Sequence, residues 1–201
     1  MSRIRIESVS GPLAAQPEVA RRAATLLARG EVMGFVAPFS GPLTVEVVRD
    51  SLSGLAAHGV AIRAAVGVDE DHLGEAIELA LEGTEHSPMP DGEWASMLET
   101  LGDDLLARLV CVSPSSLRRY AAGARRAPDS IVGRLHTLAL VVADLAGAYN
   151  DYGIRRWFAR SRTVLEGRSP EGVLAGEWDP DGPEAARVRR LAAGVVGASA
   201  S

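Results

Sequence analysis

The sequence contains one cysteine, Cys111, and no lysine. A single cysteine excludes an internal disulfide, and this usage favours a reducing cytoplasm as the location of the protein. No apolar run is long enough to span a bilayer, and the first residues lack the basic, apolar and small-residue succession of a signal peptide. A membrane partner is therefore not expected. Because all 21 basic residues are arginines, every contact with phosphate or carboxylate would be made by a planar guanidinium group.

Signatures of catalysis and of metal binding are also missing. The four histidines stand far apart, without the spacing of metal ligands. There is no glycine-rich phosphate loop and no serine nucleophile elbow. The acidic run at 69–71 fails as a calcium loop, because Leu73 and Ala80 stand where ligands are required. We therefore expect no catalytic site, no metal and no cofactor, and we interpret Cys111 as a small structural residue.

Charge is distributed unevenly along the chain. The net charge is −5, which by itself argues against a nucleic-acid partner. Residues 1–104, however, hold 7 arginines against 17 acids, whereas residues 105–170 hold 11 arginines against 4 acids. Residues 171–201 hold 3 arginines against 5 acids. A local basic region is what attracts a polyanion, so the middle of the chain is the candidate for nucleic-acid binding. Arg108 and Arg134, taken singly, are expected on an ordinary solvated face.

Residues 106–120 have the pattern of two short helices around a tight turn. Ser113 can cap the second helix, with Pro114 at the favoured first position. Leu117 and Tyr120 then share the inner face, as in a helix-turn-helix whose second helix enters the major groove of DNA. The plainer alternative is a pair of amphipathic helices without that function. The residues expected to contact DNA are Ser113, Ser115, Ser116, Arg118 and Arg119 on the second helix, and Arg125 and Arg126, mainly at phosphates.

Cys111 is the one residue that fits this motif poorly. Turns of this kind often contain glycine, because glycine adopts a left-handed conformation without steric cost. A side chain in that conformation is less favourable. The sequence therefore predicts a tight or strained turn at this position.

Apolar periodicity and turn residues predict the remaining elements. Strands are predicted at 3–9 and 32–37, and helices at 17–29, 43–57, 69–81, 93–101 and from Pro128 along an apolar face to Tyr149. A break rich in glycine, proline and serine at 83–92 indicates a domain boundary. Ser169 and Pro170 predict a short capped helix that Gly176 ends, and a last helix begins after Asp181.

The C-terminal half resembles a known family. The features that carry the resemblance are Trp157-Phe158, Leu165, Gly167-Arg168-Ser169-Pro170 with Leu174, and a closing helix bearing Val188 and Leu191. Together with the preceding helix-turn-helix, residues 93–195 resemble the bacterial Xre-type antitoxins that carry the Xre/MbcA/ParS toxin-binding domain. Ser161-Arg162 departs from the proline and asparagine common there. The resemblance implies a protein that represses its own operon and blocks a cognate toxin, often a RES-domain enzyme.

The expected fold class is mainly α. We expect an N-terminal module at 1–88 whose fold stays open and includes an α/β possibility, a helix-turn-helix bundle at 89–150, and a small helical toxin-binding domain at 151–201. The two activities are expected in separable segments, in a homodimer that reads a two-fold operator. The residues expected to bind the toxin are Arg155, Arg156, Arg168, Trp178 and Leu191. The alternative is a free-standing transcriptional regulator whose N-terminal module is a sensor or a dimerisation domain, whereas an enzyme built on 1–88 has little support.

Overall fold

The computed structural model describes residues 4–65 and 71–198, and it is mainly helical, as the sequence predicts. Contacts within the chain divide it into two compact units, unit 1 at 1–88 and unit 2 at 89–201. The division falls where the sequence predicts a break. Within the described residues no division falls near residue 150, so the segments expected as a DNA-binding domain and a toxin-binding domain form one unit.

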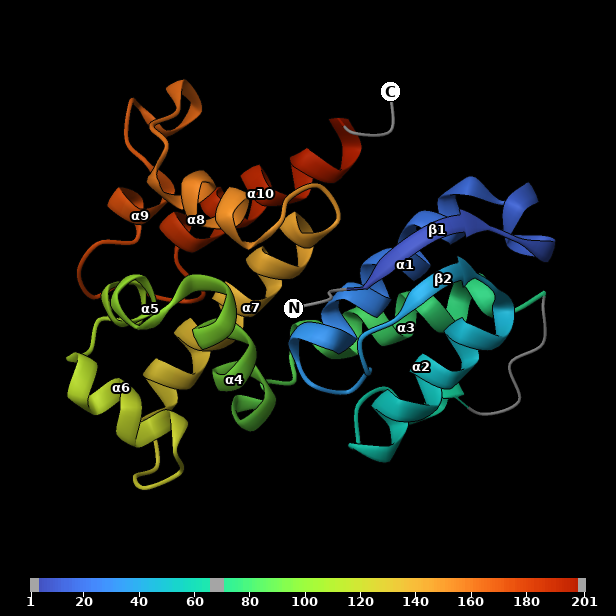
Figure 1. Cartoon of the computed structure of the whole chain (residues 1–201), viewed down its shortest axis with the longest axis horizontal. Helices are drawn as coiled ribbons and strands as arrows, with labels where there is room; N and C mark the ends of the chain where they lie inside the picture. Colours follow the sequence, from blue (N-terminus) through green and yellow to red (C-terminus); the bar gives the residue numbers. More distant parts are fainter. Residues whose placement is uncertain (1–3, 66–70, 199–201) are drawn as a thin grey trace. The chain divides into compact units, whose positions relative to one another are not determined.

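Unit 1 combines three helices with a small parallel sheet. β1 and β2 pair in parallel from Arg5 opposite Ser40 to Val9 opposite Leu43, and α1 stands between them in the sequence (Figure 1). Its core is formed by apolar side chains of all three helices, such as Leu26, Leu52 and Ile77. The elements of unit 1 are β1 (Arg5–Val9), η1 (Gly11–Ala15), α1 (Pro17–Val32), β2 (Ser40–Leu43), α2 (Val45–Ala57), η2 (Ile62–Ala65) and α3 (Leu73–Glu85).

The strand predicted at 32–37 is wrong, because α1 continues through Gly30 to Val32. The backbone carbonyl of Gly30 accepts hydrogen bonds from the amides of Phe35 and Val36, at 2.7 and 3.1 Å. A Cβ on Gly30 would lie only 2.5 Å from the Val36 side chain. This glycine therefore serves close packing rather than a helix end, and the second strand forms later, at Ser40–Leu43.

A buried arginine joins the first and third helices of unit 1. Arg29 on α1 is 7% exposed and donates to the Leu81 carbonyl at 3.2 Å and to Thr84 Oγ1 at 3.3 Å. It also forms an ion pair with Glu85 at 2.8 Å. These contacts extend α3 beyond its predicted end at 81. Asp69 and Glu70, expected to open this helix, lie outside the described residues.

Unit 2 is built around α7, whose side chains are buried almost continuously from Ile131 to Leu145. Figure 1 shows α7 crossing the unit, and α4, α8 and α10 pack against it, α10 most extensively. Tyr149, expected on the same apolar face, lies beyond the helix and is 38% exposed. The elements of unit 2 are α4 (Pro90–Leu101), α5 (Asp103–Leu109), α6 (Pro114–Ala121), α7 (Asp129–Ala146), α8 (Asp151–Ala159), η3 (Thr163–Leu165), α9 (Pro170–Val173) and α10 (Pro183–Ala198).

A buried polar pair fixes α4 to α7. His136 Nδ1 lies 2.6 Å from Glu93 Oε1, and Glu93 is fully buried. Two polar groups withdrawn from water need each other as partners, so this contact specifies how the two helices meet.

Hydropathy along the described helices gives no single helix that is both long and apolar enough to cross a membrane. α7 and α8 reach the required length and composition only as a pair, with a bend of 117° between them.

Candidate nucleic-acid interface

The turn between α5 and α6 is closed by two backbone hydrogen bonds. The amide of Val112 donates to the Ala107 carbonyl at 3.0 Å, and the amide of Cys111 donates to the Arg108 carbonyl at 3.2 Å. This pair of bonds is the Schellman motif, which ends a helix through one residue in left-handed conformation. Cys111 is that residue, with φ of 60°. The strained position predicted from the sequence is therefore present, and it sets the direction in which α6 leaves the turn.

The first turn of α6 is fixed by a serine cap. Ser113 Oγ accepts a hydrogen bond from the amide of Ser116 at 3.2 Å, and it lies 3.0 Å from the hydroxyls of Ser115 and Ser116. The Ser113 hydroxyl is thus already engaged, although the sequence assigned it to DNA contact. Its role in the structure is to hold the start of α6, with Pro114 at the first helical position.

The inner face of α6 anchors the helix on the unit. Leu117 is fully buried, and Tyr120 stacks on Trp94 of α4 with ring centroids 6.3 Å apart. The guanidinium of Arg125 lies over the same Tyr120 ring, 5.7 Å from its centroid. Tyr120 therefore packs α6 against α4 through Trp94, and it also contacts the exposed Arg125, which follows α6 in the sequence.

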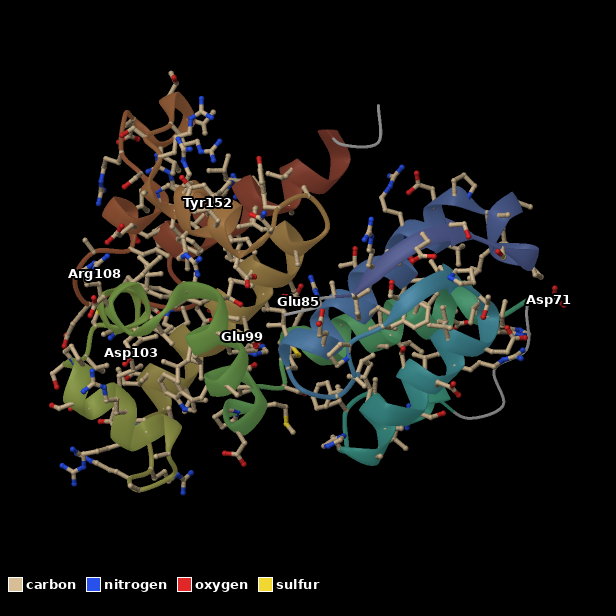
Figure 2. All side chains as sticks on the ribbon, in the orientation of Figure 1. Asp71, Glu85, Glu99, Asp103, Arg108 and Tyr152 are labelled. Carbon is tan, nitrogen blue, oxygen red and sulfur yellow. The ribbon has the colours of Figure 1, made fainter. Side chains whose placement is uncertain are left out.

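The outer face of α6 is polar and basic. Ser115, Arg118 and Arg119 are exposed, and Ser116 is half-buried. Arg118 Nε lies 3.1 Å from Asp103 at the start of α5, and Figure 2 labels Asp103 in that position. Both partners of this ion pair are exposed, so the pair is weak and orients the guanidinium without withholding it from another anion. The structure thus brings four of the seven predicted DNA contacts to one helix surface, with Arg125 and Arg126 exposed just beyond it.

Segments far apart in the sequence meet behind the turn. The Trp178 indole N–H donates to the Leu109 carbonyl at 2.8 Å, and Arg134 Nε donates to the Trp178 carbonyl at 2.8 Å. Arg134 is 8% exposed and also stacks over the Trp178 ring, 5.9 Å from its centroid. Two expectations are corrected here. Arg134 lies inside the unit rather than on a solvated face, and Trp178, 5% exposed, is a core residue rather than a surface anchor for a toxin.

Further contacts tie the C-terminal segment to the helix-turn-helix. Arg108 on α5, labelled in Figure 2, pairs with Glu171 of α9 at 2.7 Å. Cys111 Sγ contacts the carbonyl of Gly176. Burial raises the pKa of the Cys111 thiol above its ordinary value, against the opposing effect of the nearby Arg134 charge. These residues share one core, so 153–201 belongs to the same unit as the helix-turn-helix, and toxin binding by this segment alone stays a prediction.

The predicted toxin-binding residues do not form one surface. Arg155 donates to the Thr100 carbonyl at 2.7 Å and so ties α8 to α4, whereas Arg168 donates to the nearby Gly172 carbonyl. Leu191 is half-buried in α10. Arg156 is exposed, with its guanidinium 5.7 Å from the Tyr152 ring centroid. Of the five, Arg156 lines a hollow in the surface.

That hollow is a groove of about 820 Å³ along α8. Sequence reasoning missed it, because it singled out the arginines and not the two tyrosines beside them. The spacing of four residues between Tyr152 and Arg156 is the signal that could have shown one shared helix face. The groove is lined by Tyr149, Tyr152, Arg156, Trp157, Arg160 and Arg162, among others.

Among the residues that the structure describes, no group of three or more His, Cys, Asp or Glu side chains is placed to hold a metal ion. Comparison with protein-family models, with curated proteins and with solved structures gives no match to this chain.

Proposed function

We propose that this protein is a DNA-binding antitoxin that represses its own operon and neutralises a cognate toxin in the cytoplasm. The observation that carries the DNA-binding half is the outer face of α6. Ser115, Arg118 and Arg119 are exposed on a helix that starts at a fixed turn, and no core contact occupies that face. Guanidinium forks and short hydroxyls are the groups that read base edges in a major groove.

The roles of the arginines differ with their position. Arg118 and Arg119 lie on α6 itself and would reach base edges, whereas Arg125 and Arg126 follow the helix and would contact phosphates. Because one helix-turn-helix reads only a half-site, the protein would act as a homodimer on a two-fold operator.

The toxin-binding half of the proposal rests on the resemblance of 93–195 to Xre-type antitoxins. A feature of unit 2 supports it independently. The large hydrophobic side chains that stand exposed in its described part are Tyr149, Tyr152 and Val164, all within a short stretch around α8. Exposed apolar side chains gathered in one region are typical of a surface that another protein covers.

DNA binding is tested with a labelled fragment of the protein's own promoter and fluorescence anisotropy at fixed salt. Replacing Arg118 and Arg119 together by alanine should raise the Kd at least tenfold, since one base-reading arginine contributes about 1–3 kcal/mol. The control is Arg21→Ala with Arg63→Ala, which removes the same charge from exposed positions in unit 1. Equal affinity of the Arg118, Arg119 double variant and the wild type would exclude α6 as the reading helix.

Neutralisation is tested in cells by co-expression with the product of the reading frame adjacent to this gene, which the proposed function requires to be a toxin. Full-length protein should restore growth, and the Arg118, Arg119 double variant should restore it as well, because those residues are assigned to DNA. A free-standing regulator, the alternative function, would repress its promoter and give no rescue.

A further inference from the structure

The floor of the α8 groove holds two donors that lack acceptors. Trp157 is 2% exposed, and its indole N–H has no hydrogen-bond partner among the described residues. The same is true of the buried Nε of Arg162, whose guanidinium lies over the Trp157 ring at 5.4 Å from the centroid. A buried donor without an acceptor costs free energy that a ligand oxygen can recover. Both atoms are closed to solvent in the structure, so a ligand oxygen reaches them only when the Trp157 or Arg162 side chain moves.

The rim of the groove adds two more guanidinium groups. Arg156 on α8 and Arg160, the residue that follows the helix, are both exposed, and none of the ion pairs of the described residues involves either of them. Stacking on Tyr152 holds Arg156 in place, so little side-chain entropy remains to be lost when it binds an anion. Three arginines and no acid line this groove, which calls for a ligand with several negative charges.

The remaining lining is aromatic. Tyr152 is 62% exposed and Tyr149 38% exposed, and both border the arginines. Tyrosine, tryptophan and arginine are the residues most enriched at the energetic centres of protein interfaces. A simple polyanion would use the guanidinium groups and leave these rings in water, whereas a peptide with both acidic and apolar side chains would use both.

We propose that the groove lined by Tyr149, Tyr152, Arg156, Trp157, Arg160 and Arg162 binds an acidic segment of a partner protein that also carries apolar side chains. Its carboxylates pair with Arg156 and Arg160, and its apolar side chains cover the two tyrosines. This inference rests on the toxin-binding half of the proposed function, because it names the surface that the toxin would use.

The test uses the full-length protein and a short fluorescein-labelled peptide rich in glutamate and leucine. Its matched control peptide has glutamine in place of every glutamate. Fluorescence anisotropy should show that the glutamate peptide binds at least about tenfold more tightly than the glutamine peptide, with the difference shrinking at high salt. The variant Arg156→Gln with Arg160→Gln should lose this preference, and Tyr152→Ala should weaken binding of both peptides.

A matched control separates the groove from general charge. Arg63→Gln with Arg190→Gln removes two exposed arginines elsewhere and should bind the glutamate peptide as the wild type does. Since Arg156, Arg160 and Tyr152 are exposed, their variants should unfold in urea at the wild-type midpoint, which shows that any loss is local.

Several outcomes would overturn the inference. They are equal binding of the two peptides, absence of binding, and unchanged binding by the Arg156, Arg160 variant. Tighter binding of tripolyphosphate or of duplex DNA at the same residues would make the groove a phosphate site instead. Rescue from the toxin by the Arg156, Arg160 variant would refute the groove and leave the proposed function standing, whereas failure of the wild type to rescue would refute the function itself.

Discussion

The indole N–H of Trp178 donates to the carbonyl of Leu109, the last residue of α5, across 69 positions of sequence. That carbonyl belongs to a helix end, where backbone acceptors have no partner within the helix. The C-terminal segment thus completes the helix-turn-helix, and a substitution at Trp178 should act on the residues proposed to contact DNA only through the fold.

Trp178→Ala should lower the free energy of unfolding by about 3–5 kcal/mol, since it leaves a cavity where a buried indole was. Trp178→Phe keeps most of the volume and removes the donor, at a cost of about 1–3 kcal/mol for the unpaired carbonyl. Urea denaturation followed by circular dichroism measures both. A wild-type midpoint for Trp178→Ala would show that this residue is not part of the core.

Removing the buried carboxylate of Glu93 should destabilise the protein strongly. Glu93→Ala removes the carboxylate that lies 2.6 Å from His136 Nδ1, and breaking a buried pair costs about 3–5 kcal/mol. The exposed Glu99 on the same helix offers a matched control, because Glu99→Ala removes an acid from the surface. Equal thermal midpoints of the two variants would contradict this assignment.

The left-handed backbone at Cys111 predicts an order among substitutions. Cys111→Val should be the least stable, because a branched side chain is poorly accommodated at positive φ and the conformation costs about 1–2 kcal/mol even for ordinary residues. Cys111→Gly should be at least as stable as the wild type, since glycine adopts this conformation readily. Thermal unfolding of the three proteins gives the order, and a valine variant as stable as the glycine variant would contradict it.

The raised pKa of the Cys111 thiol predicts a loss of stability in alkali. The folded state keeps this proton at a pH where an unfolded cysteine, with a pKa of about 8.5, has lost it. The contribution to stability is therefore complete below the unfolded pKa, and it disappears as the pH rises through the higher folded pKa. As the pH rises, the free energy of unfolding of the wild type should fall relative to that of Cys111→Ala, which has no thiol to titrate. The measurement is the difference between the two free energies at neutral and at alkaline pH. A constant difference across this range would refute the prediction.

Arg125 and Arg126 should control the salt dependence of DNA binding. Replacing either by alanine should weaken binding to all sequences alike and reduce the slope of log K against log salt by about one. Replacing Arg119 should instead weaken binding at one operator position. Anisotropy titrations at several salt concentrations, on operator and scrambled DNA, separate the two behaviours. Unchanged slopes would mean that neither arginine contacts phosphate.

The sequence predicted those features of unit 2 that depend only on residues close together in the chain. Ser113-Pro114 and Ser169-Pro170 are caps that act within a few residues, and both start the helices that they predict. Cys111 was recognised because a turn needs a particular φ whatever surrounds it.

The features that the sequence did not predict depend on contacts between residues or segments that only the folded chain brings together. Gly30 looks like a helix end in the sequence, and only the approach of Val36 shows why α1 passes through it. Arg134 and Trp178 carry polar groups that usually face solvent. In the structure each donates to a backbone carbonyl far away in the sequence, Arg134 to that of Trp178 and Trp178 to that of Leu109. The groove with its tyrosines and arginines forms only when α8 and the residues on either side of it are folded.

The packing of α10 on α7 has a consequence for the lifetime of the protein. A protease that trims the chain from its C-terminus removes α10 and uncovers the buried side of α7, which also supports α4. Loss of α10 would therefore destabilise α4 and the α6 helix packed on it, and under the proposed function repression and toxin neutralisation would end in the same event.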